Sequence, residues 1–264
     1  AMTVGAADDG PGRLLTSAEE VPSGQGEFAV HFNERRGLIH ADLKVGANVL
    51  SALKLRTNTG ISSLGMMRAG GGFVVTADEA ASLGLHTREG AALHLRPFFN
   101  GRDITDIPRG HWLIDVFGMD ESQLRFRLPE VFQHLSARVK PERDLNRRER
   151  LRNQWWVFGE PRQGLRAALV GLDRYIVTVE TAKHRTFTFL PATALPDHKL
   201  VAIASGEALH LGALSSAVHV AWAMAAGGRL GVGNDPVYSK STCFDPFPFP
   251  SDDTGLTPEL TTRI

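Results

Sequence analysis

The sequence predicts an α+β fold built on a mixed or antiparallel sheet into which helices are inserted. Runs with the alternation of β-strands occur in groups, and helical segments interrupt these groups without the regular strand–helix alternation of an α/β fold. The strongest strand signals are Tyr175–Glu180, Arg185–Leu190 and Lys199–Ala204, which follow one another along the chain. A chain of 264 residues, 42% of them hydrophobic, is also long enough to bury a sizeable core.

The N-terminal part is predicted to start with a flexible segment and to become ordered near Glu27. Residues 1–26 are rich in Gly, Ala, Asp and Pro and show little periodicity. Phe28–Phe32 then alternates as a strand does, and a turn at Arg35–Gly37 makes Leu38–Leu43 its expected hairpin partner.

The middle of the chain mixes a short helix with two strands. Thr76 and Glu79 have the spacing of a capping box, which predicts a helix start. Two β-rich runs, 92–99 and 111–117, are expected to be joined through a turn at Asn100–Gly101.

Three helices are predicted in the second half of the chain. Pro129 suits the first position of a helix that runs to about Val139, and Pro161 opens another that ends near Leu172. Gly206–Ala226 is predicted to be one long helix, because its apolar residues recur at steps of three and four.

These elements predict a division of the chain into four parts. A flexible segment is followed by a strand pair with a linker, a main domain and a short tail. The expected boundaries are 1–26, 27–60, 61–250 and 251–264.

Composition excludes several classes of protein. Lys and Arg number 29, as do Asp and Glu, so the formal net charge is zero and a polycationic tail is excluded, although a local basic face is not. Cys243 is the single cysteine, which excludes a disulfide framework within the chain and fits a reducing, cytoplasmic setting. No apolar run approaches the roughly 20 residues needed to span a bilayer, so no membrane partner is expected.

A cluster of basic residues between Arg138 and Arg152 is the first candidate binding surface. It holds seven basic residues against three acids, and guanidinium groups bind phosphate oxygens well. The alternative is a solvated helix face on which Glu142, Asp144 and Glu149 neutralise the arginines. The candidate phosphate contacts are Arg143, Arg147, Arg148 and Arg152.

Two further segments are candidates for contact with bases. Lys183, His184 and Arg185 lie in a short connection between two strong strands, where a turn can enter a DNA groove, although any basic surface turn has the same pattern. The second segment is a Gly-rich loop with hydrogen-bonding side chains suited to base edges and phosphates, or else a surface loop with Asx turns. Its candidate residues are Arg229, Asn234, Asp235, Tyr238, Lys240 and Ser241.

Other conspicuous residues are expected to be structural. Trp155 and Trp156 are flanked by apolar residues and are predicted to lie in the core. His219 lies in an apolar helix with no other histidine at a metal-ligand spacing, so it is predicted to be a hydrogen-bonded core histidine and no metal is expected.

Six long motifs between Ala41 and Pro250 resemble one known family. The chain is similar to the target-recognition half of class I SAM-dependent adenine-N6 DNA methyltransferases of the single-chain type II, MmeI-like, restriction–modification family. The motifs that carry the resemblance are Ala41–Met66, Leu95–Thr105, Val139–Arg162, Thr178–Leu190, Leu211–Trp222 and Gly227–Pro250.

The resemblance implies a target-recognition-domain-like fold and a function in reading duplex DNA. It implies that 27–60 comes from the edge of a methyltransferase domain, and that a catalytic domain in cis or on a separate chain is the partner. A Gly-rich strand-to-helix loop for SAM and an Asn-Pro-Pro-Tyr loop for the flipped adenine are not found in the 264 residues. We therefore expect no catalytic residue and no cofactor in this chain, with SAM bound elsewhere in the full enzyme.

Two other functions are compatible with the residues. One is a small enzyme that uses carboxylates among Asp103, Asp106, Asp115 and Asp120, for which paired carboxyl groups with raised pKa values in one cleft would be evidence. The other is a protein-interaction module that docks through the exposed aromatic segment Phe244–Pro250.

Overall fold

The computed structural model describes residues 10–24, 26–40, 45–230, 235–251 and 255–263. The chain divides into two units, 1–52 and 53–264.

The N-terminal unit is a long antiparallel β-hairpin. Strand β1 (Gly12–Gly24) pairs with β2 (Glu27–Gly37), and Glu34 on β2 accepts hydrogen bonds from Arg13 and Arg36. Phe28, Val30 and Phe32 alternate along β2 and therefore share one face, which is exposed.

Two expectations for the N-terminal unit were wrong. Residues 12–24 form a strand instead of a flexible segment, and this strand is the partner of β2. The expected partner was Leu38–Leu43, of which residues 41–43 lie outside the described part of the chain. The cross-strand ion pair between Arg13 and Glu34 joins residues 21 positions apart, so the local composition of 1–26 did not reveal the pairing.

Two four-stranded sheets form the centre of the C-terminal unit. One has the order β3-β10-β7-β8 and is fully antiparallel, and the other has the order β4-β6-β5-β9 with β5 and β9 parallel. A small hairpin pairs β11 with β12. The strands are β3 (Ser62–Leu64), β4 (Val74–Val75), β5 (Leu95–Phe99), β6 (Trp112–Ile114), β7 (Arg174–Val179), β8 (Thr188–Pro191), β9 (Leu195–Pro196), β10 (Leu200–Ile203), β11 (Gly228–Leu230) and β12 (Asp235–Val237).

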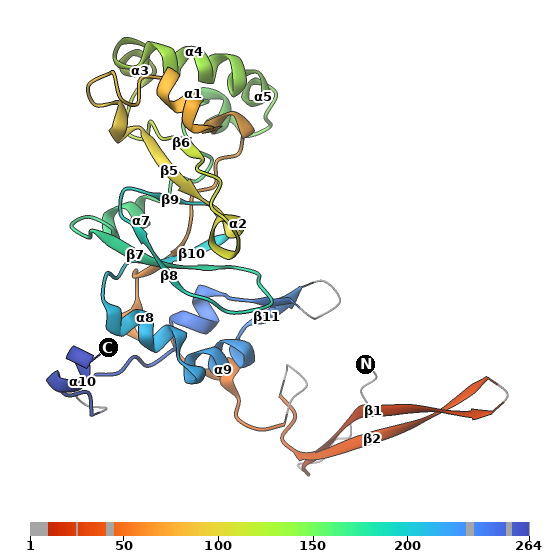
Figure 1. The fold of residues 1–264 in the computed structure, drawn as a ribbon. Coiled ribbons are helices and arrows are strands. Elements are labelled where there is room, and N and C mark those ends of the chain that lie inside the picture. The colour runs from red at the N-terminus through yellow and green to blue at the C-terminus, as the bar shows by residue number, and fades with distance from the viewer. Residues whose placement is uncertain (1–9, 25, 41–44, 231–234, 252–254, 264) are drawn as a thin grey trace. The chain divides into compact units, whose positions relative to one another are not determined.

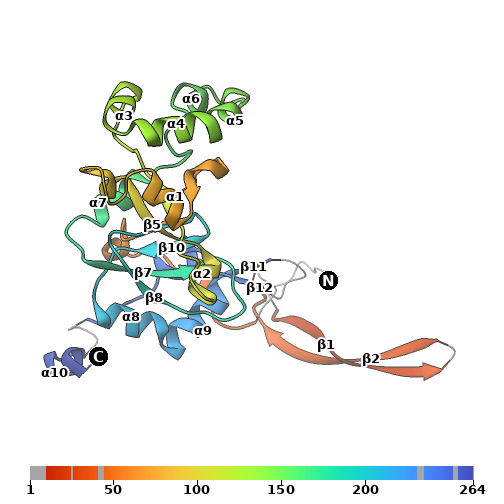
Figure 2. The same ribbon diagram turned by 45° about the horizontal axis from the view of Figure 1, so that its top comes forward.

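Helices lie at both ends of this unit. In both ribbon views α3, α4 and α5 lie beyond β5 and β6, whereas α8 and α9 lie beyond β7 and β8 at the opposite end (Figures 1 and 2). The α-helices are α1 (Ala77–Ser82), α2 (Gly101–Thr105), α3 (Glu121–Arg127), α4 (Pro129–Arg138), α5 (Lys140–Asp144), α6 (Glu149–Asn153), α7 (Gln163–Ala168), α8 (Ala208–Ser215), α9 (Ala217–Ala226) and α10 (Pro258–Arg263).

Strands β7 and β10 are buried on both faces because they separate two hydrophobic cores. Along β7, Tyr175 and Val177 belong to the first core with the helices α3 and α4, while Ile176 between them belongs to the second. Val201 and Ile203 of β10 also face the second core. This alternation follows from the period of two in a strand, and it explains the apolar run Tyr175–Val177 in β7.

Several predicted elements are confirmed. The capping box of Thr76 and Glu79 starts α1, and Pro129 is the first residue of α4. Trp155 is 3% exposed in the first core, and Trp156 is partly buried with its indole N–H donating to the carbonyl of Met119.

Asn100 does not form the expected turn. Its side chain accepts from the backbone N–H of Arg102, while its own N–H donates to Asp103, so Asn100 caps the helix α2. Asparagine is favoured both in turns and at helix N-caps. Here the carboxylate of Asp103, three residues later, completes a capping box with Asn100 and so favours the helix start.

The predicted long helix Gly206–Ala226 is interrupted at Ser216. The backbone of Ser216 is extended, and its hydroxyl accepts from the N–H of His219 to cap α9. Among the described residues, no single helix is long and apolar enough to cross a membrane, and α8 with α9 meets that test only as a pair bent by 61°.

Candidate nucleic-acid interface

The connection between β7 and β8 and the β11–β12 hairpin form one continuous surface. Thr181 makes a β-bridge with Val237, and the N–H of Ala182 donates to the carbonyl of Pro236 at 3.2 Å. The N–H of Tyr238 donates in turn to the carbonyl of Glu180 at 2.7 Å. The two segments predicted separately as base contacts are therefore joined by backbone hydrogen bonds (Figure 1).

Arg185 lies between these two segments and is half-buried, unlike the exposed Lys183 and His184. Its guanidinium donates to the hydroxyl of Thr178, the carbonyl of Val179 and the carbonyl of Pro236, and it lies over the ring of Tyr238. Burial lowers the pKa of Arg185 from its ordinary value. The sequence prediction grouped Arg185 with its exposed neighbours, but both of its terminal guanidinium nitrogens donate to acceptors within the protein.

Tyr238 is also part of the interior. It is 1% exposed, and its hydroxyl oxygen lies 2.9 Å from Nε2 of His219, whose ring packs edge-on against Phe247. Burial raises the pKa of Tyr238 well above its usual range, and burial together with the positive charge of Arg185 lowers the pKa of His219 to about 4. His219 is thus confirmed as a hydrogen-bonded core histidine, whereas Tyr238 is too buried to reach a base.

A cleft of about 920 Å³ opens beside this surface, between α2 and the β7–β8 connection. Helix α2 approaches β7 closely at Gly101, where an added Cβ would lie 3.2 Å from Cγ1 of Val179. Lys183 and His184 lie on one side of the cleft and Arg102 on the other. Within the described part of the chain, Arg102 and Lys183 have no side-chain hydrogen-bond or ion-pair partner, so both charges are available to a ligand.

Carboxylates also lie at this cleft. Asp103 is 5% exposed and is held by both the backbone and the guanidinium of Arg109. Asp106, at the end of α2, is exposed and lines the cleft with Arg102. The positive potential is therefore concentrated at Arg102 and Lys183 and does not extend over the whole rim.

The remaining predicted residues lie on the hairpin or in the helical turn Lys240–Phe244 that follows it. Arg229 and Asp235 are exposed on β11 and β12, while Asn234 lies outside the described residues. Lys240 lies 3.7 Å from a carboxylate oxygen of Asp245, and Ser241 is hydrogen-bonded to Ser239. Arg229 and Asp235 are the members of this group that face solvent most fully.

The arginine cluster lies in the helical layer of the first core, apart from this surface. Arg143 is fully buried in α5 and donates to the carbonyls of Arg68 and Val157, so its predicted contact with phosphate is wrong. Arg147, Arg148 and Arg152 are all exposed, and one guanidinium nitrogen of Arg152 donates to the backbone carbonyls of Asn146 and Arg147. Arg147 and Arg148 thus remain candidates for phosphate contact.

Neutralisation of this cluster by its own acids is limited. Lys140 pairs with Asp144 at 2.7 Å along α5, as the alternative interpretation expected. Glu149, however, accepts from the amide of Asn153 and is not paired with an arginine in the described structure. The cluster therefore keeps part of its positive charge.

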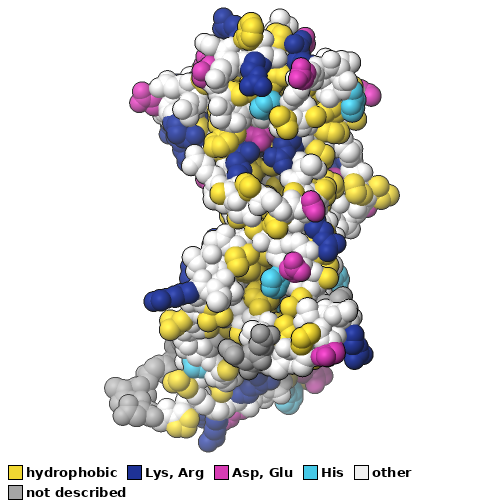
Figure 3. Space-filling view, turned by 90° about the vertical axis from the view of Figure 1, so that its left-hand side faces the viewer, with side chains coloured by type: hydrophobic (Ala, Val, Ile, Leu, Met, Phe, Trp, Pro, Cys, Tyr) yellow, Lys and Arg dark blue, Asp and Glu magenta, His cyan; other side chains and the backbone are white. Residues whose placement is uncertain are grey.

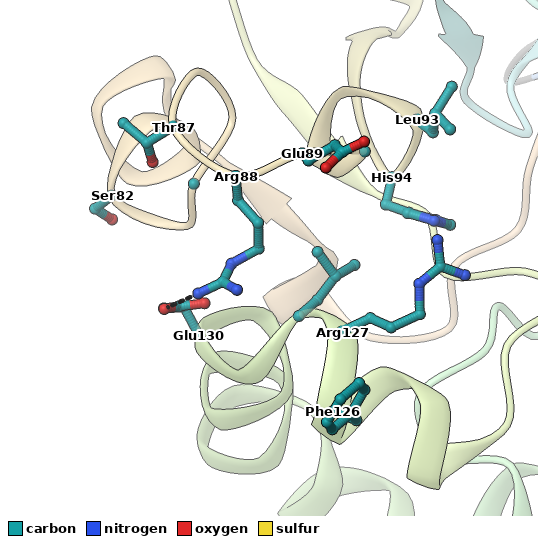
Figure 4. Close-up of a pocket in the computed structure, with 12 residues that line it drawn as sticks. Ser82, Thr87, Arg88, Glu89, Leu93, His94, Phe126, Arg127 and Glu130 are labelled. Atoms are coloured by element: carbon teal, nitrogen blue, oxygen red, sulfur yellow. Dashed lines mark hydrogen bonds and ion pairs between the residues drawn. The ribbon is translucent and has the colours of Figure 1, made fainter.

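A second cleft, of about 810 Å³, lies in the helical layer between the α1–β5 segment and the end of α3. Arg88 and Glu130 form an ion pair of 2.5 Å within it, and Arg127 and His94 point toward one another (Figure 4). Phe126 at its edge is 87% exposed. Because acidic and basic groups balance here, this cleft is less suited to a polyanion than the one beside Lys183.

The carboxylates considered for an enzyme are used structurally. Burial works to raise the pKa of Asp103, but hydrogen bonds from Arg109 and Asn100 outweigh it and leave the pKa below its usual value. Asp115 accepts two hydrogen bonds from Arg166, at 2.7 and 2.9 Å, and Asp120 caps α3. Asp103 and Asp106 both line the cleft beside Lys183, but Asp103 is held by Arg109, and among the described residues no group of three ligands suits a metal ion.

The aromatic C-terminal segment is likewise part of the interior. Phe244 is 2% exposed and Phe247 6%, and the side chain of Asn58 donates to the carbonyls of both. On the face of the molecule seen in Figure 3, basic side chains are interspersed with acidic and hydrophobic ones and form no single continuous patch. Phe244 and Phe247 are therefore not exposed for docking, and this side of the molecule carries no broad basic face.

Comparison with known proteins identifies the family. A family model described as the target recognition domain of MmeI matches residues 54–251, which is most of the chain. The chain belongs to this family. The target recognition domain also resembles the structure of the type IIL restriction–modification enzyme MmeI in complex with DNA, with a TM-score of 0.63 and 20% sequence identity. The likeness covers 83% of this chain and 29% of that one, and no curated protein sequence matches.

Family membership confirms the resemblance and the α+β class predicted from the sequence. The match begins at residue 54, next to the division between the two structural units at residues 52 and 53. The target recognition domain therefore corresponds to the C-terminal unit, which contains the whole candidate interface.

Proposed function

We propose that this chain reads a short duplex DNA sequence on behalf of an adenine-N6 methyltransferase in a restriction–modification enzyme. The observation that carries the proposal is the continuous surface made by the β7–β8 connection and the β11–β12 hairpin in a target recognition domain. The chain spans 29% of the MmeI chain, so SAM binding and methyl transfer are assigned to other parts of the full enzyme.

The proposed contacts divide into positioning and reading groups. Arg102, Lys183 and His184 at the cleft are placed to hold phosphates, because their donors face solvent and charge is what the DNA backbone recognises. On the hairpin, Asp235 has the chemistry to accept from a cytosine amino group and Arg229 to donate to guanine. Asn234, known here from the sequence alone, has the chemistry to pair with adenine.

Selection from a pool of randomised duplexes tests this function. We expect the 264-residue chain to enrich one short motif, with an affinity that falls steeply as salt rises. Asp235→Asn should change or relax one position of that motif, at about 1–3 kcal/mol of discrimination, without altering the melting temperature. Enrichment of no motif by the unaltered chain would disprove the proposed function.

The assignment of SAM to another part of the enzyme has its own test. Gly228, the first glycine of the Gly-rich run, follows helix α9 and begins strand β11, whereas a SAM loop follows a strand and opens a helix. We expect calorimetric titration of this chain with SAM to give no saturable heat. A one-to-one binding isotherm would contradict the assignment.

A further inference from the structure

Arg185 is a half-buried cation in a surface proposed to meet DNA, and its contacts come from two segments far apart in the sequence. One guanidinium nitrogen donates to Thr178 and Val179 on β7, and the other donates to Pro236 on β12 at 3.3 Å. The guanidinium carbon lies 5.1 Å from the centre of the Tyr238 ring. Arg185 thus connects the β7–β8 connection with the hairpin.

This junction determines where the exposed side chains stand. Lys183 and His184 immediately precede Arg185 in the connection, and Asp235 immediately precedes Pro236 in the hairpin. Backbone hydrogen bonds from Ala182 to Pro236 and from Tyr238 to Glu180 lie beside the guanidinium. If the junction opened, the phosphate-contacting and base-reading side chains would lose their fixed spacing.

Within the described residues, no carboxylate lies within ion-pair distance of Arg185. The nearby acids Glu180 and Asp245 are paired with Lys199 and with Lys54 and Lys240. The partners of Arg185 are carbonyl oxygens, a hydroxyl and an aromatic ring. The planar guanidinium can contact all of them at once, because its N–H donors point in several directions. A lysine ammonium is a point charge without that fork, so it is not an equivalent replacement.

We propose that Arg185 is a positioning residue for sequence discrimination, which holds the two reading segments in register without touching DNA itself. This inference rests on the proposed function. The sequence had grouped Arg185 with the exposed basic residues Lys183 and His184 as a DNA contact. In the proposed role Arg185 instead holds the segment that carries these two residues in place.

The test compares Arg185→Lys and Arg185→Met with the unaltered chain on the duplex enriched from the randomised pool and on a scrambled duplex. We expect discrimination between the two duplexes to fall by at least about tenfold. The slope of log affinity against log salt should not change, because no phosphate contact is lost. A slope smaller by about one unit would show that Arg185 binds phosphate and would overturn the proposal.

Hydrogen exchange gives a readout that does not depend on DNA. The amides of Ala182 and Tyr238 should exchange faster in both variants, while amides of β10 should not. Unchanged exchange at both amides, or unchanged discrimination, would overturn the positioning role. The β10 amides also report whether a variant has simply lost its fold.

Two control variants separate this role from general effects of buried groups. Tyr238→Phe keeps the ring beneath Arg185 and removes only the hydroxyl that meets His219, so discrimination should be preserved. Arg143→Met removes another buried arginine, in the helical layer, and should also preserve it. If the unaltered chain enriches a motif and the Arg185 variants retain it, the positioning role fails while the proposed function stands.

Discussion

At the residue scale, His219 links burial to pH dependence. Its ring is fully buried, Nε2 meets the hydroxyl of Tyr238, and Nδ1 has no partner in the described structure. Burial and the charge of Arg185 lower its pKa to about 4, against about 6.5 in the unfolded chain. The unfolded state therefore binds a proton at a higher pH than the folded state does, and the folded state loses stability as pH falls from about 6.5 toward 4.

We expect His219 to remove about 2 kcal/mol from the free energy of unfolding between pH 7 and pH 5. Urea unfolding of the unaltered chain and of His219→Gln at both pH values measures this contribution. The variant should lose less stability over that interval, because it has no proton to gain. Parallel losses in the two proteins would contradict the expectation.

The arginine cluster contains two kinds of residue that had looked alike in the sequence. Arg143→Met should lower the free energy of unfolding by about 2 kcal/mol, because two buried carbonyls lose their donors. Its DNA affinity should keep the same salt dependence. Arg147→Ala with Arg148→Ala should do the reverse, with unchanged stability and a smaller salt slope. Chemical unfolding and salt-dependent binding of both proteins distinguish the two groups.

At the scale of elements, the N-cap that Ser216 provides between α8 and α9 should contribute measurably to the free energy of unfolding. Ser216→Ala removes the hydroxyl that accepts from His219 N–H at the start of α9. The loss of an N-cap of this kind costs about 1 kcal/mol. Ser216→Asp retains an acceptor and is the matched control, which should stay near the stability of the unaltered chain in thermal unfolding. Equal destabilisation by both changes would assign the effect to packing instead of capping.

Much of the fold followed from local signals. The capping box at Thr76, the proline at the start of α4 and the apolar strands β7, β8 and β10 were predicted because each is encoded within a few residues. The break at Ser216 was missed because the apolar spacing runs through it and serine is compatible with both a helix interior and a cap. The strand β1 was missed because its partner lies in a separate segment.

The site was predictable in its segments but not in its residues. The sequence located the β7–β8 connection and the hairpin, yet it did not distinguish exposed Lys183 from half-buried Arg185. Arg102 was overlooked because the turn expected at Asn100 carried no functional signal. The exposure of Lys183 and Arg185, and the hydrogen bond of Arg185 to Pro236, depend on contacts between distant parts of the chain. Composition and residue spacing carry no information about such contacts.

At the scale of the whole C-terminal unit, two cores share the strands β7 and β10. We expect the two cores to unfold together, because neither can lose its packing without disturbing those strands. Trp155 lies in the first core and Trp222, which donates to the carbonyl of Cys243, lies beside the second. In Trp222→Phe the remaining tryptophans, Trp112, Trp155 and Trp156, all lie in or against the first core, so its fluorescence and its circular dichroism should give coincident transitions. Separate midpoints by the two signals in one protein would show independent cores.

The bonded contact between the β7–β8 connection and the hairpin also bears on how a new specificity could arise by recombination. If only the β7–β8 connection were replaced by that of a relative, the relative's residues at positions 182 and 185 would have to bond to the Pro236 carbonyl of this chain. If only the hairpin were replaced, its residue at position 236 would have to accept from Ala182 and Arg185 of this chain. Residues 180–187 and 228–238 are therefore best exchanged as a single cassette, although some forty residues of sheet, α8 and α9 separate them in the gene.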